Sequence, residues 1–248
     1  MKSANCCPWS TGYLSGQVHS ARREKVRRPL AAQSHPRVAT HRDLGFLFSI
    51  PKVLAVDILA TMQIPEELVA KCKSLNRPAI IAISGFGGAG KSTFANALGT
   101  KLDAPVIGID SFARDRLEKG SLWEAMDFDR LEKEVLIPFS TNTKLIEYGH
   151  YDWGKNEVMK TKLAEHNGFL ILEGVGLLRP NLNKYFSYKI WVDCPKEEAV
   201  RRGKKRDREE YKNPRDENWD GIWMENDTQY FETFKPKEAA DFVFSNCD

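Results

Sequence analysis

A glycine-rich segment constrains this chain more than any other feature of its sequence. It fits the pattern G-x-x-x-x-G-K-[ST] and directly follows the apolar, β-branched run 79–83, which predicts a buried parallel strand. Glycines let the backbone N–H groups of such a loop surround an anion at the positive end of the next helix. The pattern predicts a phosphate-binding loop that holds a nucleotide through Gly85, Gly87, Gly88, Ala89, Gly90, Lys91, Ser92 and Thr93.

Strands and helices alternate along the rest of the chain. Further short apolar runs, typical of buried strands, lie at 106–109, 169–172, 189–192 and 241–244. Helical patterns lie at 64–75, 91–101, 129–137, 196–210 and 216–234. Strands joined by helices make right-handed crossovers. We therefore expect an α/β, P-loop NTPase fold, with a doubly wound, mostly parallel five-stranded sheet and helices on both faces.

The charge distribution sets the first part of the chain apart. Residues 1–43 hold eight Lys or Arg against two acids, with little hydrophobic periodicity. Such a segment cannot bury enough apolar surface to offset its ordering entropy. We expect a basic, disordered extension over residues 1–60 and one folded domain over 61–248. A targeting peptide, a nucleic-acid-binding arm and an over-extended start remain open as explanations of the extension.

The cysteines and the hydropathy of the sequence indicate the cellular compartment. The five cysteines are odd in number and lack zinc-site spacing, which predicts a reduced, intracellular protein without a disulfide framework. No stretch reaches the roughly 18 apolar residues of a membrane span. We expect a cytoplasmic protein with no membrane partner. Whether it forms a homo-oligomer is open.

Two acids follow strands of the predicted sheet. Asp110 comes directly after the second strand and Glu173 ends the third. Ligands of a doubly wound sheet bind at the carboxyl ends of its strands. Asp110 there is a candidate base for an acceptor hydroxyl, or simply a helix cap. Glu173 is a candidate Mg²⁺ ligand, or a solvated acid.

A charged helix supplies candidate cations. Arg202 and Arg206 are four residues apart and share a helix face, which suits a clamp on a phosphoryl group. A solvated helix face is the alternative. Asn213-Pro214 interrupts the helical pattern after this stretch and predicts a lid over about residues 200–218. A GTPase is disfavoured because the chain's Asn-Lys dipeptide continues Tyr-Phe, whereas the guanine-recognition motif is Asn-Lys-x-Asp.

These motifs, taken in order, resemble one family. The phosphate loop, Ile109-Asp110-Ser111-Phe112, Tyr151-Asp152-Trp153, Leu172-Glu173-Gly174-Val175, Arg202-x-x-x-Arg206-Asp207 and the segment 223–230 are similar to the uridine kinase and phosphoribulokinase group of P-loop kinases, nearest to a bacterial uridine-kinase-like branch. The resemblance covers about residues 79–243. It implies ATP and Mg²⁺ as cofactors, Lys91 on the phosphates, and Asp110 as general base. It also implies Ser92 and Glu173 on Mg²⁺, and Arg202 and Arg206 in a mobile lid.

The acceptor site departs from the family pattern. Uridine kinases carry a His and an Arg where this chain has Asn156 and Val158. Recognition of a pyrimidine base is therefore not predicted. Candidate acceptor residues are Arg114, Asp127, Tyr151, Asp152 and Trp153.

The sequence thus predicts a kinase whose acceptor is a small-molecule hydroxyl, on a nucleoside or a related ribosyl or sugar-like alcohol. Two alternatives remain. One is a non-catalytic nucleotide-binding protein, and the other is a nucleic-acid-associated ATPase that uses the basic extension. The acids interspersed in the basic helix disfavour nucleic acid as a partner.

Overall fold

The structure is a computed structural model that describes residues 62–114, 121–152, 155, 157–163 and 166–247. The predicted extension over residues 1–60 lies outside the described residues.

Five parallel strands form the main sheet. They are β1 (Ala79–Ser84), β2 (Val106–Gly108), β5 (Phe169–Glu173), β6 (Tyr188–Asp193) and β7 (Phe242–Ser245), in the order β2-β5-β1-β6-β7. The predicted five-stranded parallel sheet is therefore confirmed. All six residues of β1 are buried, as expected for a central strand covered on both faces.

The register of the sheet aligns the strand ends that matter for the site. Glu173 on β5 pairs with Ile83 on β1 and with Gly108 on β2. The phosphate loop begins two residues after Ile83, and Asp110 comes two residues after Gly108. Parallel pairing therefore brings three separate sequence motifs to one edge of the sheet.

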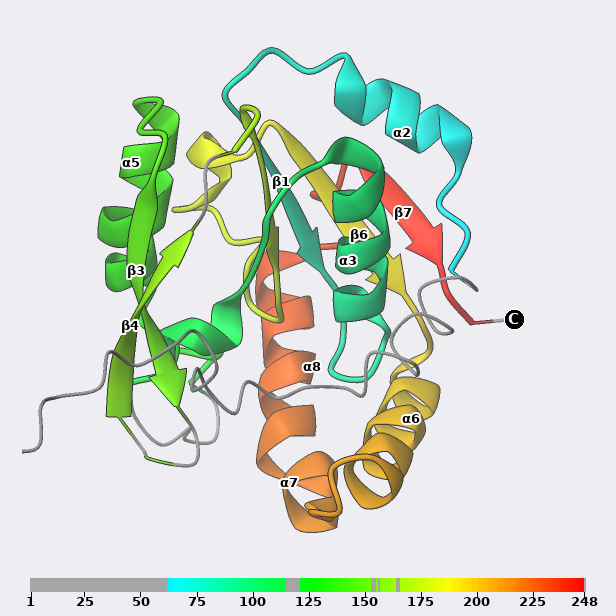
Figure 1. Cartoon of the computed structure of the whole chain (residues 1–248). Coiled ribbons are helices and arrows are strands. Elements are labelled where there is room, and N and C mark those ends of the chain that lie inside the picture. Colours follow the sequence, from blue (N-terminus) through cyan, green and yellow to red (C-terminus); the bar gives the residue numbers. More distant parts are fainter. Residues whose placement is uncertain (1–61, 115–120, 153–154, 156, 164–165, 248) are drawn as a thin grey trace, which may run out of the picture. The chain divides into compact units, whose positions relative to one another are not determined.

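Helices cover both faces of the sheet (Figure 1). The α-helices are α2 (Glu66–Lys73), α3 (Lys91–Leu102), α4 (Phe128–Leu131), α5 (Ile137–Ser140), α6 (Lys196–Glu209), α7 (Asp216–Asp220) and α8 (Ile222–Phe234). A π-helical turn (Glu132–Leu136) joins α4 to α5, and short 3-10 helices span Ile109–Phe112 and Asn183–Tyr185. In the described part of the chain, no helix combines the length and the apolar character needed to cross a membrane.

Alternate residues of β1 contribute to two apolar clusters. Ile81 and Ile83 pack with side chains of α2 and α3, whereas Ile80 and Ala82 pack with those of the α4–α5 region. Successive side chains of a strand point to opposite faces, so one strand serves both clusters. This arrangement anchors the phosphate loop, which leaves the end of β1, between two packed layers.

An antiparallel hairpin was not predicted. β3 (Ile146–Asp152) pairs with β4 (Glu157–Leu163), from Ile146 opposite Leu163 to Asp152 opposite Glu157. Strand β4 has the sequence EVMKTKL and leaves Val158 and Met159 exposed. It therefore lacks the apolar run by which the buried strands were recognised.

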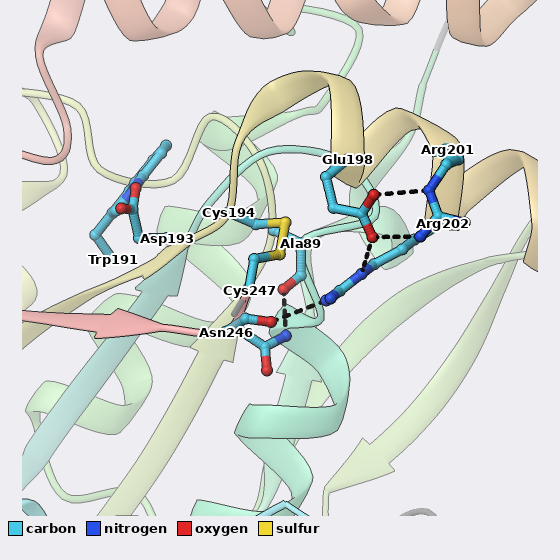
Figure 2. Close-up of a disulfide and its surroundings, with 9 residues drawn as sticks. All are labelled: Ala89, Trp191, Asp193, Cys194, Glu198, Arg201, Arg202, Asn246 and Cys247. Atoms are coloured by element: carbon cyan, nitrogen blue, oxygen red, sulfur yellow. Dashed lines mark hydrogen bonds and ion pairs between the residues drawn. A yellow bond between two sulfur atoms is a disulfide. The ribbon is translucent and has the colours of Figure 1, made fainter.

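The prediction that the chain has no disulfide was wrong. Cys194 and Cys247, 53 residues apart in sequence, are joined by a disulfide, while Cys72 is a buried free thiol. β6 and β7 are neighbours, and Asp193 pairs with Ser245. The two cysteines lie just beyond that pair and face each other (Figure 2). Their long sequence separation concealed this proximity.

Candidate active site

The phosphate loop has the backbone that its glycines predicted. Gly88 and Gly90 have φ values of 82° and 92°, in the left-handed region, and Gly90 is the N-cap of α3. A Cβ at Gly88 would lie 2.0 Å from the Ala199 carbonyl oxygen of α6. The loop is therefore pressed against α6 so closely that only glycine fits at this position.

The two polar side chains that end the loop lie at the start of α3. Lys91 is 8% exposed, and its Nζ donates to the carbonyl oxygen of Phe86, across the loop, at 2.9 Å. Burial lowers the pKa of Lys91, while Glu173, Asp227 and Asp110 oppose that shift. The lysine thus places a cation at the loop and has several acids around it.

The predicted carboxylates gather at this cation. Ser92 donates its hydroxyl to Glu173 Oε1 at 3.1 Å. Burial raises the pKa of Glu173, against the opposing effect of Lys91, and the nearby Asp110 raises it further. Asp110 itself is exposed at the mouth of the site, yet the surrounding protein raises its pKa by desolvation, again against Lys91. The structure therefore brings together Lys91, Ser92, Asp110 and Glu173, as expected from the strand ends.

The oxygen atoms of Ser92 and Glu173 fit a magnesium ion. Mg²⁺ at phosphoryl-transfer sites takes one or two protein oxygens and completes its shell with phosphates and water. Within the described ranges, no group of three or more His, Cys, Asp or Glu residues is placed to hold a metal. The donor set is thus that of an ion held jointly with a nucleotide rather than enclosed by protein.

The arginines of the predicted lid separate into two groups. The charges of Arg206 and Arg215 act on Asp110 and lower its pKa, against the desolvation by the surrounding protein. Arg202 instead pairs with Glu198 and donates to the carbonyl oxygen of Asn246. The charge of Arg206 thus acts on the candidate base, but Arg202 contacts a different segment.

Arg215 was missed in the sequence because it lies beyond the helix that carries the other arginines. A fully buried carboxylate, Asp207, holds it near the site: Arg215 Nε lies 3.3 Å from Asp207 Oδ2. Trp219 Nε1 donates to the same oxygen at 2.9 Å, and Arg206 Nη2 donates to Oδ1 at 3.1 Å. Asp207 therefore connects α6 to α7 across the Asn213-Pro214 break.

A second missed residue is Asp227 on α8, which is 4% exposed. Its carboxylate accepts the N–H of Gly87, in the phosphate loop, at 2.7 Å and the Trp123 Nε1–H at 3.0 Å. Burial raises the pKa of Asp227 to about 6, although both hydrogen bonds oppose the shift. The sequence did not indicate this contact, because Asp227 and Gly87 are 140 residues apart.

The predicted acceptor residues occupy two places. Arg114 and Asp127 line an open cavity of about 340 Å³ together with Asp129, Arg130, Lys133 and Glu134. The side chain of Asp127 also caps α4 by accepting the Arg130 N–H at 2.9 Å.

The other acceptor candidates belong to the hairpin. Tyr151 is buried on β3, and Asp152 accepts the Lys155 N–H at 3.1 Å in the turn between the strands. Trp153 lies outside the described residues. The structure thus does not place the two groups of acceptor residues around one cavity.

Comparisons with known proteins agree with this geometry. A family model described as an AAA domain matches residues 81–224. A uridine kinase of Alkaliphilus metalliredigens is 35% identical over 149 residues, which cover 55% of this chain and 71% of that protein. This chain belongs to the AAA domain family and to the uridine kinase-like group of P-loop kinases.

Other matches of this uridine kinase-like chain are more distant. A uridine kinase of Clostridium botulinum (strain Langeland) is 30% identical over 131 residues, which cover 48% of this chain and 64% of that protein. The solved structure of a possible uridine kinase from Bacillus stearothermophilus covers 76% of the chain and 98% of its own, with a TM-score of 0.55 at 18% identity. That likeness shows the shared P-loop kinase fold.

Proposed function

We propose that this uridine kinase-like protein transfers the γ-phosphoryl group of ATP, with Mg²⁺, to a hydroxyl group of a nucleoside or a related ribosyl or sugar-like alcohol. The observation that carries the proposal is the meeting of Asp110 with Lys91 and with the Ser92–Glu173 pair at one sheet edge. A nucleotide-binding loop alone does not need a carboxylate at its mouth. A phosphotransferase does, because its acceptor hydroxyl must lose a proton.

The donor side of the reaction is electrostatic. The loop N–H groups bind the phosphates, and Lys91 exchanges the Phe86 carbonyl for the β and γ phosphate oxygens. Ser92 and Glu173 would hold Mg²⁺, which would supply positive charge to neutralise the transferring group. Arg206 and Arg215 add positive charge from the lid side and help exclude water.

Asp110 acts on the acceptor. Its carboxylate accepts a hydrogen bond from the acceptor hydroxyl, orients it toward the γ phosphate and takes its proton as the bond to phosphorus forms. The raised pKa brings this carboxyl closer to the operating pH, which makes it a more effective base than a fully solvated aspartate.

The acceptor itself is constrained by charge. Three cations and three carboxylates line the cavity at Arg114 and Asp127, which suits a polar molecule with several hydroxyls better than an apolar one. Tyr151 and Asp152 lie on the hairpin, outside the lining of this cavity, so the proposed acceptor contacts are those of Arg114 and Asp127.

The test is acceptor-dependent release of ADP from MgATP by the full chain. The panel contains nucleosides, nicotinamide riboside, pantothenate, ribulose 5-phosphate and glycerate. We expect one acceptor to stimulate release. Asp110→Asn should then retain ATP binding and lower kcat by about 10²-fold or more. Asp103→Asn is the matched control, because Asp103 is exposed and its left-handed φ of 51° suits asparagine.

Other results would contradict the proposal. ATP binding without acceptor-dependent release by any member of the panel would favour the non-catalytic reading. Hydrolysis stimulated by DNA and lost on deletion of residues 1–43 would favour the nucleic-acid-associated ATPase. Equal loss of ATP binding and turnover in Asp110→Asn would make Asp110 a structural residue.

A further inference from the structure

The segment after β7 contacts the phosphate loop from outside. Asn246 Nδ2 donates to the Ala89 carbonyl oxygen at 2.7 Å, and the Asn246 N–H donates to the Asp193 carbonyl oxygen at 2.9 Å. A Cβ at Gly90 would lie 2.3 Å from Asn246 Nδ2. The amide therefore rests directly on the loop. We call Asn246 and Cys247 the clasp.

Besides the Asn246 N–H bond to Asp193, two further ties hold the clasp in place (Figure 2). Cys247 is bonded to Cys194, which is 2% exposed at the end of β6. Arg202 Nη1 donates to the Asn246 carbonyl oxygen at 2.9 Å, and Arg202 Nε donates to Glu198 Oε1 at 2.8 Å. One tie is covalent and the other is a charge-assisted hydrogen bond. The disulfide is therefore the covalent link that joins the residue after Asn246 to the end of β6.

The contact with Ala89 controls a loop donor. The peptide group between Ala89 and Gly90 is planar, so in its trans form the carbonyl and the N–H point in opposite directions. Because the Ala89 carbonyl accepts from Asn246, the Gly90 N–H of the same peptide group points away from Asn246. Donors that are oriented before an anion binds need no reorganisation on binding, and this raises affinity.

We propose that Asn246 is a positioning residue for nucleotide binding and that the Cys194–Cys247 disulfide controls it. The inference rests on the proposed function, since it concerns nucleotide affinity at the same loop. A dithiol transfers two electrons to the disulfide, which leaves the thiols of Cys194 and Cys247 and the oxidised, cyclic form of the reagent. Without its covalent tie the clasp leaves Ala89 more often, and the nucleotide binds more weakly.

The experiment measures MgADP binding to the full chain by calorimetry, before and after treatment with dithiothreitol. Thiol labelling of the denatured protein follows the oxidation state. Loss of one positioning hydrogen bond predicts a rise in Kd of about five- to ten-fold on reduction. Asn246→Ala should show the same rise when oxidised, and reduction should not change its Kd further. A general structural defect would not abolish the redox response in this way.

Two further variants isolate the clasp. Ser245→Ala alters an exposed residue at the end of β7 and should keep both the Kd and the redox response of the unaltered chain. Cys247→Ser should bind weakly with or without dithiothreitol. Because this variant keeps Cys6, Cys7, Cys72 and Cys194, any remaining response to the reagent would come from those four thiols and not from the Cys194–Cys247 disulfide.

Several outcomes overturn the proposal. The same Kd before and after verified reduction refutes redox control. A response to dithiothreitol that persists in Asn246→Ala refutes the role of that residue. Labelling of Cys194 and Cys247 before any reduction refutes the disulfide. If MgADP binds equally well before and after reduction, only the proposed role of the clasp is refuted. If MgADP does not bind in either redox state, the proposed function is overturned as well.

Discussion

Asp227 makes the stability of this protein depend on pH in a direction unusual for an aspartate. Its carboxyl is 4% exposed, and burial raises its pKa from 3.8 to about 6. The folded protein therefore holds this proton at pH values where the unfolded chain has lost it. The resulting stabilisation is fully present below pH 3.8 and is lost as the pH rises through 6.

The magnitude follows from the size of the shift. A shift of about two pKa units corresponds to about 3 kcal/mol, since one unit is about 1.4 kcal/mol. About 2.5 kcal/mol of this difference falls between pH 4 and pH 8. Asp227→Asn removes the titration, so the contribution of Asp227 is the difference between the two proteins at each pH.

The assay is urea unfolding, followed by far-ultraviolet circular dichroism, of the full chain and of Asp227→Asn between pH 4 and pH 8. We expect the free energy of unfolding of the unaltered chain, relative to the variant, to fall by about 2.5 kcal/mol over this range, mostly between pH 4 and pH 6. The variant also turns one carboxylate oxygen into a donor facing the Gly87 N–H or the Trp123 Nε1–H, which adds an offset that does not depend on pH. A difference that stays constant with pH, or that rises with it, would refute the reasoning.

Three further predictions concern the loop, the lid and the core. Gly88→Ala should raise the Kd for MgADP, measured by calorimetry, by more than about tenfold. The reason is that the added Cβ would lie 2.0 Å from the Ala199 carbonyl oxygen. An unchanged Kd would contradict the packing of the loop on α6. Arg215→Met should lower kcat with the best acceptor by about tenfold or more. The control Lys205→Met, at an exposed site of α6, should leave kcat unchanged. An equal loss of kcat in the two variants would show that Arg215 does not act at the site. Trp191→Ala should destabilise the fold by about 3–5 kcal/mol in urea unfolding, since the side chain is fully buried; a loss below about 1 kcal/mol would contradict its place in the core.

The acids at the ends of the parallel strands could be predicted from the sequence. Asp110 and Glu173 were chosen because parallel strands align their carboxyl ends, and the pairing of Gly108 with Glu173 realises that alignment. The apolar pattern was sufficient for the five strands of the main sheet, because each contains a short apolar run. It failed for β4, a charged edge strand whose sequence shows neither an apolar run nor a clean alternation.

Side chains that meet across long sequence distances were not predictable. Arg202 and Arg206 are equivalent by helical spacing, yet one contacts Asn246 and the other acts on Asp110. The contact of Asp227 with Gly87 depends on how α8 packs beside the loop.

The sequence by itself determined the phosphate loop, the parallel sheet and the acids at the strand ends. These features are local, because glycine positions and apolar periodicity act on the neighbouring backbone. Tertiary structure alone decided which arginines lower the pKa of Asp110, which acid holds the loop, and that Cys194 and Cys247 form a disulfide. Each of these contacts joins residues that are distant in the chain and come together only when the sheet and its covering helices pack.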